Sequence, residues 1–250
     1  MNYSRQLELY DAENRQDVAY IIGAGATGSW LSLILAKLGI SIIKVIDYDV
    51  IEEHNLPNQF FKNRQVGMFK VNALRKNIEE YFSLEAGGMQ AYNLAVGTPP
   101  NTDIGTFSYE DLKAYIQRDT ASGRTVTVFC LVDSMKARKE ILEGLLGVGC
   151  NAIRFIETRM GLTGYRIYDI DLSNSKEVEK YKETLYSDDD AEVSACGTSQ
   201  SIVSTAIQCA SHAVGLWLGN MNGVDYIPNE LIFDIQSSVL LTNKFDKGEE

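Results

Sequence analysis

The N-terminal third of the chain alternates an apolar run, apolar residues at helical spacing and a second apolar run. Val18–Ile22 is a short continuous apolar stretch, as expected for a buried β-strand. From Trp30 to Leu38 the large apolar residues recur at helical spacing, and Gly39 ends that helix. The mainly β-branched stretch Ile42–Ile46 predicts a second strand. The pattern therefore predicts a strand–helix–strand unit.

The same alternation continues to the C-terminus. We expect further helices at residues 70–82, 109–116, 135–146, 176–186 and 199–218, and further strands at 89–96, 125–132, 151–158, 165–170 and 231–241. A turn at 161–164 favours an antiparallel pairing of the strands on either side of it. Alternating strands and helices predict an α/β fold, with a Rossmann-like, doubly wound, mainly parallel sheet. Helices cover both faces of this sheet, and additional antiparallel strands lie near the C-terminus.

We expect residues 1–250 to form a single domain. Residues 1–16 are polar and predict a solvated N-terminal arm, in which the stretch from Tyr3 to Leu7 has no obvious local partner. Residues 187–196 are rich in acidic side chains and predict a mobile crossover loop. Residues 244–250 predict a disordered tail.

A glycine-rich turn, Gly23-Ala24-Gly25-Ala26-Thr27-Gly28, joins the first strand to the first helix. Glycines let the backbone approach phosphates, and a helix N-terminus offers unpaired N–H groups with a partial positive charge. Asp47 follows Gly28 by 19 residues, where a nucleotide-binding βαβ unit places the acid that holds a ribose hydroxyl. The alternative is a tight strand–helix turn that merely needs glycines. The context on both sides favours a nucleotide-binding unit.

A second strand–helix junction carries polar residues at Asp133 and Ser134. In open α/β sheets, ligands bind at the carboxyl ends of the strands, so Asp133 is a candidate ligand-binding residue. The alternative is that Asp133 only caps the helix that follows. Position alone does not separate these two interpretations.

Charge and composition argue against several classes of function. The 250 residues carry a formal charge of −11, which argues against a nucleic-acid surface. No apolar run approaches the roughly 20 residues that span a bilayer, and the polar N-terminus is not a signal peptide. The four cysteines include no C-x-x-C pair, so we expect a reduced, cytoplasmic protein without a zinc knuckle.

Six sequence elements occur together in the order typical of one family. They are a Tyr-Ser-Arg-Gln arm at 3–6, the glycine turn at 23–28, an Asp-x-Asp tip at 47–49, an Asn-Leu-x-x-Gln segment at 55–59, Gly67 followed by Lys70, and the strand that ends in Asp133. On these motifs the sequence resembles the ThiF/MoeB/HesA family of adenylating enzymes, the relatives of ubiquitin-activating enzyme. The resemblance covers almost the whole chain. A cysteine before the C-terminal helix is also common in the family, and Cys196 lies there.

The resemblance implies a site for ATP and Mg²⁺. Adenylation builds charge on phosphoryl oxygens, so it needs cations and positioned donors more than a general base. Lys70 is then the phosphate cation, Asp133 the Mg²⁺ ligand and Asp47 the ribose ligand. The implied nucleotide-binding set is Gly23, Gly25, Ala26, Gly28, Asp47, Asp49, Asn55, Asn58, Gln59, Lys70 and Ser134.

Two further residues have roles that only the resemblance implies. Arg5 resembles the arginine that reaches across a homodimer to the phosphates bound by the partner. Cys196 follows an acidic loop and precedes a helix N-terminus, which favours the thiolate although the nearby acids oppose it. It is either a nucleophile in a thioester or persulfide step, or a structural thiol. We expect Cys130, Cys150 and Cys209 to be small buried residues.

One position departs from the family pattern. The usual arginine before the glutamine of the Asn-Leu-x-Arg-Gln segment is Asn58 here, so a bidentate cation is replaced by a neutral amide. The change either reduces adenylation or is compensated by Lys62 or Arg64. The paired zinc cysteines of many relatives are absent too, which predicts a compact variant with no metal besides Mg²⁺.

Three functions remain open from the sequence. The first is ATP-dependent adenylation of a carboxylate, most often in this family the C-terminal glycine of a small ubiquitin-like or sulfur-carrier protein, and in some relatives a peptide or a modified nucleoside. The second is a non-catalytic nucleotide-binding subunit or scaffold, which the change at Asn58 motivates. The third is an NAD-dependent oxidoreductase, since Asp47 fits NAD as well as ATP. The expected partners are the carrier protein and a second copy of the chain, with no nucleic acid and no membrane.

Overall fold

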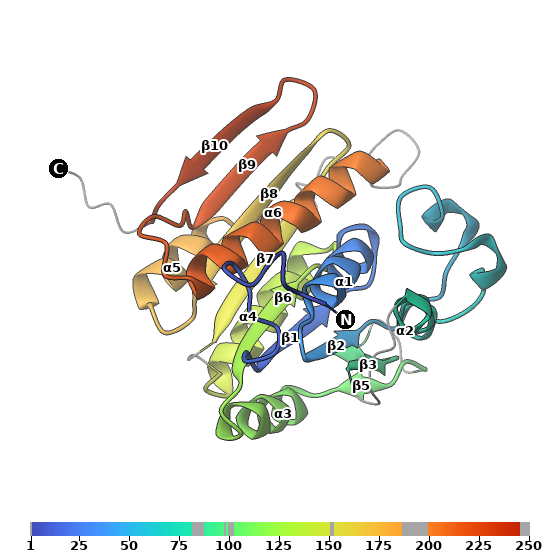
Figure 1. Cartoon of the computed structure of the whole chain (residues 1–250), viewed down its shortest axis with the longest axis horizontal. Helices are drawn as coiled ribbons and strands as arrows, with labels where there is room; N and C mark the ends of the chain where they lie inside the picture. The colour runs from blue at the N-terminus through green and yellow to red at the C-terminus, as the bar shows by residue number, and fades with distance from the viewer. Residues whose placement is uncertain are drawn as a thin grey trace.

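The described part of this computed structural model comprises residues 2–81, 88–97, 99, 103–150, 153–186 and 200–245. These residues form an eight-stranded central sheet in the order β10-β9-β8-β7-β6-β1-β2-β3 (Figure 1). The strands of this sheet are β1 (Asp17–Ile22), β2 (Ile42–Ile46), β3 (Met89–Tyr92), β6 (Thr125–Cys130), β7 (Arg154–Met160), β8 (Gly164–Asp171), β9 (Glu230–Asp234) and β10 (Val239–Asn243).

The sheet has a parallel half and an antiparallel half. Strands β7, β6, β1, β2 and β3 are parallel neighbours, with Val18 opposite Ile42 on one side of β1 and opposite Val126 on the other. Strands β8, β9 and β10 continue the sheet in antiparallel fashion from β7. The predicted fold class, including the antiparallel C-terminal strands, is confirmed.

Two predicted strands each prove to be two. The stretch 231–241 contains a reversal between β9 and β10, in which Asp234 accepts hydrogen bonds from the N–H and the hydroxyl of Ser237 and Ser238 adopts a φ of 57°. The apolar residues on both sides of this turn hid it in the sequence. The stretch 89–96 divides into β3 and β4 (Ala95–Val96), and β4 pairs with β5 (Thr106–Phe107) outside the main sheet.

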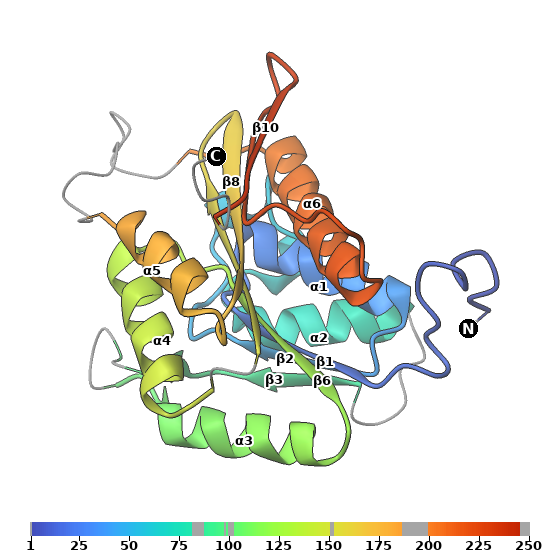
Figure 2. The ribbon, with the colours of Figure 1, turned by 90° about the vertical axis from the view of Figure 1, so that its left-hand side faces the viewer.

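Helices cover both faces of the sheet. Helices α1, α2 and α6 lie on one face and α3, α4 and α5 on the other (Figure 2). The helices are α1 (Ala26–Leu38), α2 (Lys70–Tyr81), α3 (Tyr109–Ala121), α4 (Met135–Gly147), α5 (Ser175–Glu183) and α6 (Val203–Met221). Two short 3-10 turns, Glu53–Asn55 and Asn63–Gln65, lie between β2 and α2.

Strand β1 explains why the parallel strands read as unbroken apolar runs. Its residues Ala19 and Ile21 belong to the core beneath α1 and α6, whereas Val18 and Tyr20 belong to the core beneath α3 and α4. Every residue of β1 is buried. A parallel strand covered on both faces has no polar side to alternate with.

The N-terminal arm is docked rather than solvated at two side chains. Gly39 ends α1 in the left-handed conformation, with a φ of 86°, and the ring of Tyr3 lies against it. The side chain of Gln6 donates a hydrogen bond to the carbonyl of Leu38 at 2.6 Å. The arm therefore caps the C-terminus of α1, and the expectation of a solvated arm is wrong for these residues.

The other predicted segments differ in outcome. The crossover loop at 187–196 lies outside the described residues. In the predicted tail, Lys244 donates to the carbonyl of Ile227 and the N–H of Phe245 donates to Asn229, so these two residues are held in place. None of the helices within the described residues is long and apolar enough to cross a membrane.

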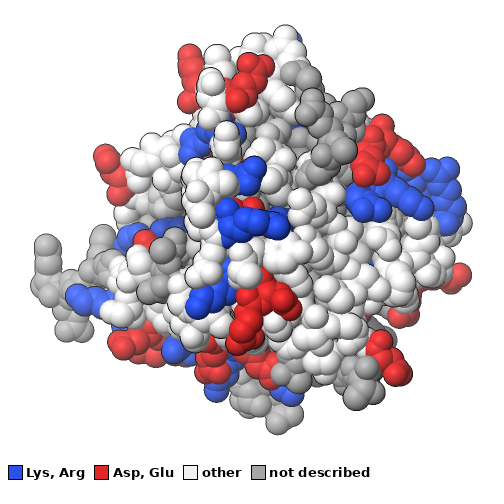
Figure 3. Space-filling model, turned by 90° about the horizontal axis from the view of Figure 1, so that it is seen from below, with Lys and Arg blue, Asp and Glu red and all other residues white. Residues whose placement is uncertain are grey.

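The face of the molecule that is seen from below carries acidic and basic side chains together (Figure 3).

Candidate functional site

A cavity of about 1010 Å³ opens at the carboxyl ends of β1, β2 and β6. This is the edge at which open α/β sheets bind their ligands. Eleven of the predicted site residues line it: Gly23, Gly25, Ala26, Asp47, Asp49, Asn55, Asn58, Gln59, Lys70, Asp133 and Ser134. Among the described residues, Gly28 and Arg5 do not line the cavity, and Cys196 lies outside the described part of the chain.

The three glycines of the turn have different reasons to be glycine. A Cβ on Gly28 would lie 2.0 Å from the carbonyl oxygen of Gly23, and Gly23 itself has a φ of 104°. Gly25 has no steric constraint, since a Cβ there would meet nothing within 4 Å. Gly28 was predicted to contact the ligand, but its position brings α1 close to the strand. Gly25 instead faces open space at the cavity wall.

Asp47 stands at the end of β2 and is held by backbone donors. Its carboxylate accepts hydrogen bonds from the N–H of Ala24 at 2.6 Å and from the N–H of Asp49 at 2.7 Å. Burial raises the pKa of this carboxyl above its ordinary value, against the opposing effect of the Lys70 ammonium. The two bonds fix the carboxylate at the glycine turn, and its remaining lone pairs can accept from a ligand hydroxyl.

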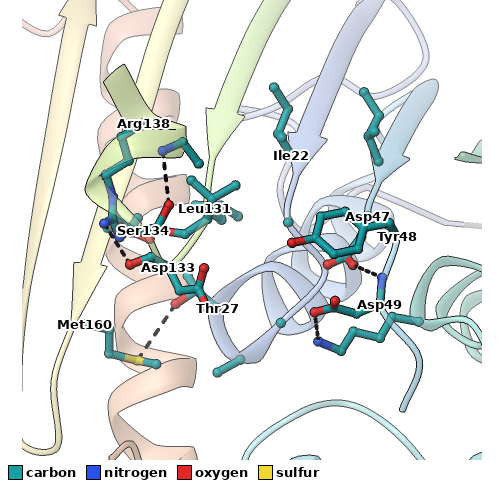
Figure 4. A pocket seen from close by; sticks show the side chains of 18 of the residues that line it. Ile22, Thr27, Asp47, Tyr48, Asp49, Leu131, Asp133, Ser134, Arg138 and Met160 are labelled. Atoms are coloured by element: carbon teal, nitrogen blue, oxygen red, sulfur yellow. Dashed lines mark hydrogen bonds and ion pairs between the residues drawn. The ribbon is translucent and has the colours of Figure 1, made fainter. Parts of the chain in front are cut away.

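Asp49 lies beside Asp47 (Figure 4) and forms an ion pair with Lys70. The Lys70 ammonium lies 2.7 Å from the Asp49 carboxylate, and the Lys70 N–H donates to the Asp49 carbonyl at 2.9 Å. Lys70 is nearly buried, with a side chain 9% exposed, whereas that of Asp49 is 48% exposed. The pair holds the ammonium at the cavity wall, where an anionic ligand can replace the exposed partner.

Two of the predicted amide donors, Asn55 and Gln59, differ in how their side-chain oxygens are bonded. Asn55 is buried, and its side-chain oxygen accepts from the N–H of Glu52 at 2.9 Å, which caps the 3-10 turn. Asn55 also lines the cavity. The side-chain oxygen of Gln59 is buried without a hydrogen-bond partner. A buried unpaired acceptor is costly, so this side chain is a candidate to rearrange when a ligand binds.

Asn58 is tied to the segment before α6. Its side-chain nitrogen donates to the hydroxyl of Ser201 at 2.5 Å, and its carbonyl accepts from the indole N–H of Trp30 at 2.9 Å. Residues 143 positions apart thus meet at the cavity wall. The side-chain amide therefore links residue 58 to the segment before α6, whereas the contact with α1 is made by the backbone carbonyl.

The two cations expected to compensate for Asn58 point elsewhere. Lys62 and Arg64 both pair with Glu80 on the outer surface of α2. Neither residue lines the cavity within the described part of the chain. Of the two alternatives, compensation by Lys62 or Arg64 is therefore not supported, because the surface carboxylate of Glu80 on α2 pairs with both side chains. A different cation, Lys136, lines the cavity from the first turn of α4.

The junction after β6 separates the two interpretations of Asp133. Ser134, not Asp133, is the N-cap of α4, and its hydroxyl accepts from the N–H of Ala137 at 3.0 Å. Asp133 is exposed at the cavity, and no described residue donates a hydrogen bond to its carboxylate. Mg²⁺ is commonly held by one or two carboxylates together with substrate phosphates and water. A single open carboxylate fits that role, although the described residues contain no cluster of three metal-ligating side chains.

Sequence reasoning missed Arg138, which also lines the cavity. Its guanidinium is almost fully buried and bonds to the carboxylate of Glu157 and to three backbone carbonyls. The signal in the sequence was Glu157, an acid that directly follows the apolar pair Phe155-Ile156 in the buried middle of β7. A buried carboxylate needs a cationic partner, but the sequence does not say which of the 23 basic residues provides it.

The three described cysteines are free and buried, as predicted: Cys130, Cys150 and Cys209. Burial raises the pKa of Cys130 and of Cys209 to about 12 in each case. Both thiols are therefore protonated at neutral pH and poor nucleophiles.

The sequence profile of the ThiF family matches residues 3–214, which include every predicted site residue. The chain belongs to the ThiF family. It is 26% identical over 134 residues to ubiquitin-like modifier-activating enzyme 5 of Arabidopsis thaliana, covering 54% of this chain and 29% of that protein. It is 34% identical over 85 residues to the adenylyltransferase and sulfurtransferase MOCS3 of Aedes aegypti, covering 31% of this chain and 20% of that protein. The chain thus spans less than a third of these curated relatives.

Solved structures of low sequence identity share the fold of this ThiF-family chain. The crystal structure of PaaA superposes with a TM-score of 0.67 at 18% identity, over 97% of this chain and 82% of that one. A structure of E. coli MccB with AMPCPP and MccA has a TM-score of 0.65 at 14% identity, over 96% of this chain and 66% of that one. A structure of E. coli MccB with ATP has a TM-score of 0.63 at 13% identity, over 97% and 71%.

Proposed function

We propose that this ThiF-family chain adenylates a carboxylate at the expense of ATP. A carboxylate oxygen attacks the α-phosphorus, the bond to the oxygen that bridges to the β-phosphorus breaks, and pyrophosphate leaves. The observation that carries the proposal is that Lys70 and Asp133 line one cavity together with the glycine turn. A cation and an open carboxylate in this arrangement suit a metal-bound polyphosphate.

Each residue of the cavity then has a defined task. Asp47 accepts hydrogen bonds from the ribose hydroxyls, and the backbone from Gly25 to Ala26 lies against phosphate. Lys70 exchanges the Asp49 carboxylate for a phosphate oxygen and stabilises the charge that develops there. Asp133 and the adjacent Ser134 hold Mg²⁺ and its nucleotide, and the ion neutralises phosphate charge when bound. Asn55, Asn58 and Gln59 supply amide groups to the nucleotide.

For the carboxylate we propose the C-terminal glycine of a small ubiquitin-like or sulfur-carrier protein. The support is the likeness to a ubiquitin-like modifier-activating enzyme and to an adenylyltransferase and sulfurtransferase. The net charge of −11 makes tRNA a poor partner. We further propose that the chain acts in the cytoplasm as a homodimer.

Pyrophosphate exchange tests the function directly. Purified chain is incubated with ATP, Mg²⁺, labelled pyrophosphate and candidate carrier proteins that end in glycine, and label entering ATP is measured. Exchange that needs the carrier supports the proposal. ATP binding without exchange, for every carrier tried, favours the scaffold interpretation instead. Calorimetry that detects NAD but not ATP would favour an oxidoreductase.

We propose that Arg5 acts on the nucleotide of the partner subunit. It is exposed on the docked arm and does not line the cavity of its own chain within the described residues. Mixing Arg5→Ala chains with Asp133→Ala chains should restore part of the exchange activity, because one site of each mixed dimer regains both groups. Inactivity of a verified mixed dimer would remove Arg5 from the site.

Cys196 is proposed as the nucleophile of a thioester or persulfide step after adenylation. The three other cysteines are buried, which leaves Cys196 as the candidate thiol. We expect Cys196→Ala to retain pyrophosphate exchange but to lose any thiol-sensitive conjugate with the carrier. If iodoacetamide fails to modify Cys196 while ATP and carrier are bound, adenylation is the whole activity.

A further inference from the structure

The carbonyls at the end of β6 lose their sheet partners where the chain turns toward α4. The last residue pair between β6 and β7 is Cys130 with Glu157, while β7 itself continues to Met160. The carbonyls of Val132 and Asp133 are part-buried and therefore need other donors, because a carbonyl withdrawn from water without a partner is costly. This is the loop that presents the Asp133 carboxylate to the cavity.

One side chain supplies the missing donors. Arg138 lies one turn into α4, is 5% exposed, and donates to the Asp133 carbonyl at 3.0 Å and to the Val132 carbonyl at 2.6 Å. The same guanidinium reaches the Thr158 carbonyl of β7 at 3.2 Å. Arg138 thus bridges the gap between the two strands and binds the backbone of the loop at two successive carbonyls.

The Arg138 guanidinium is itself held in place by Glu157 of β7. Its Nε donates to the carboxylate of Glu157 at 2.6 Å, and Glu157 is completely buried. The other oxygen of Glu157 accepts from Arg159 at 2.9 Å and from the hydroxyl of Tyr181 at 3.2 Å. Arg138 therefore has little freedom to move, and neither has the backbone that it holds.

We propose that Arg138 is a positioning residue for Asp133, which sets the place and direction of that carboxylate and through it the affinity for metal-bound nucleotide. The inference rests on the metal role of Asp133 in the proposed function. A planar fork of donors is what the arrangement requires, because one group must meet a carboxylate and three carbonyls. A lysine keeps the charge beside Glu157 but cannot make these contacts together.

Calorimetric titration of ATP with and without Mg²⁺ tests the proposal without relying on turnover. In the wild-type chain, Mg²⁺ should tighten ATP binding, and in Arg138→Lys this Mg²⁺-dependent gain should fall about tenfold. ATP affinity without Mg²⁺ should stay within a factor of about two, since Arg138 does not contact the nucleotide in this scheme. An undiminished Mg²⁺-dependent gain in Arg138→Lys would overturn the proposal.

A matched control separates positioning from general loosening of the sheet. Arg154 also pairs with a buried carboxylate, that of Asp169, but it does not line the cavity within the described residues. Arg154→Lys should lower stability and leave the Mg²⁺-dependent gain unchanged. An equal loss of that gain in Arg154→Lys would show that Arg138 has only a structural role.

Double substitution shows whether Arg138 acts through Asp133. In an Asp133→Asn background, Arg138→Lys should cause no further loss, because the two changes remove one contribution. If Asp133→Asn alone leaves the Mg²⁺-dependent gain intact, the metal assignment itself fails. If Asp133→Asn abolishes the gain while Arg138→Lys does not, only the positioning role fails.

A second variant tests the proposal in case Arg138→Lys does not fold. Glu157→Gln retains Arg138 but loosens its anchor, and it should lower the Mg²⁺-dependent gain about threefold, in the same direction. If Arg138→Lys does not fold and Glu157→Gln leaves the gain unchanged, the proposal is overturned.

Discussion

Lys44 and Lys70 are two buried lysines, each paired with an aspartate, yet their surroundings differ. On β2, the Lys44 ammonium lies 2.5 Å from the Asp119 carboxylate, and both side chains are at most 3% exposed. At the start of α2, Lys70 lies 2.7 Å from Asp49, whose side chain is 48% exposed. One pair is closed inside the sheet–helix interface, and the other opens onto the cavity.

In the closed pair, the Lys44 ammonium has further partners besides Asp119. The Lys44 ammonium also donates to the hydroxyl of Tyr20 at 2.9 Å and lies 4.9 Å from the centre of the Tyr115 ring. Burial lowers the pKa of Lys44, although Asp119 opposes this effect. No ligand can replace Asp119 without unpacking α3. A buried charge therefore indicates a binding site only when one member of its pair can be exchanged.

Substitution of the open lysine should have the largest effect. Lys70→Ala removes the cation proposed for the phosphates, so we expect pyrophosphate exchange to fall roughly 100- to 1000-fold with little change in thermal stability. Lys76→Ala is the matched control, since Lys76 is exposed on the same helix and does not line the cavity. Unchanged exchange in Lys70→Ala would contradict the adenylation proposal.

Substitution of the closed lysine should affect stability instead. Lys44→Met leaves the Asp119 carboxylate buried with a poorer partner, Arg124, at 3.7 Å, so unfolding free energy should drop by about 3–5 kcal/mol. Urea titration measures this change. Replacing both members, as Lys44→Met with Asp119→Leu, should recover part of the loss, because no unpaired charge remains. A stable single variant with impaired ATP binding would reverse the comparison.

The smallest effect that we expect is a pH dependence of the affinity for adenosine. Because burial raises the pKa of Asp47 above its ordinary 3.8, the Asp47 carboxylate becomes protonated at a higher pH than the carboxylate of an exposed aspartate does. Ribose hydroxyls need that carboxylate as acceptor, so adenosine affinity should decline several-fold on acidification through the raised pKa. Calorimetry at a series of pH values measures the decline. It should disappear in Asp47→Asn and persist in His54→Gln, which removes the titratable imidazole at the cavity wall.

Two of the cavity residues were predictable from topology because each follows a strand. Asp47 and Asp133 end strands that proved parallel, so the topology alone brings them to the same edge. Lys70 came from the family motif rather than from topology. Asn58 was recognised as a departure, but its contact with Ser201 joins segments 143 residues apart, a distance at which no sequence spacing is informative.

The remaining features of the fold and the site could not be predicted, because they depend on tertiary contacts between distant parts of the sequence. Arg138 reads as an ordinary helix residue, and only its encounter with Glu157 gives it a task. The reversal at 235–238 was hidden because apolar residues on both sides suggested one continuous strand. The roles of Lys62 and Arg64 depended on Glu80, a partner on the outer surface of α2 that spacing could not identify.

The glycine turn offers a way to read sequence drift in chains of this kind. Gly28 is fixed by its contact with the Gly23 carbonyl, and Gly23 by its positive φ and its contact with the Leu131 carbonyl, so a descendant that lost its nucleotide would still need both in order to fold. Gly25 has room for a side chain and serves only a backbone that something else must approach. Across a lineage, the first glycine to be replaced after the chemistry is abandoned should therefore be the middle one.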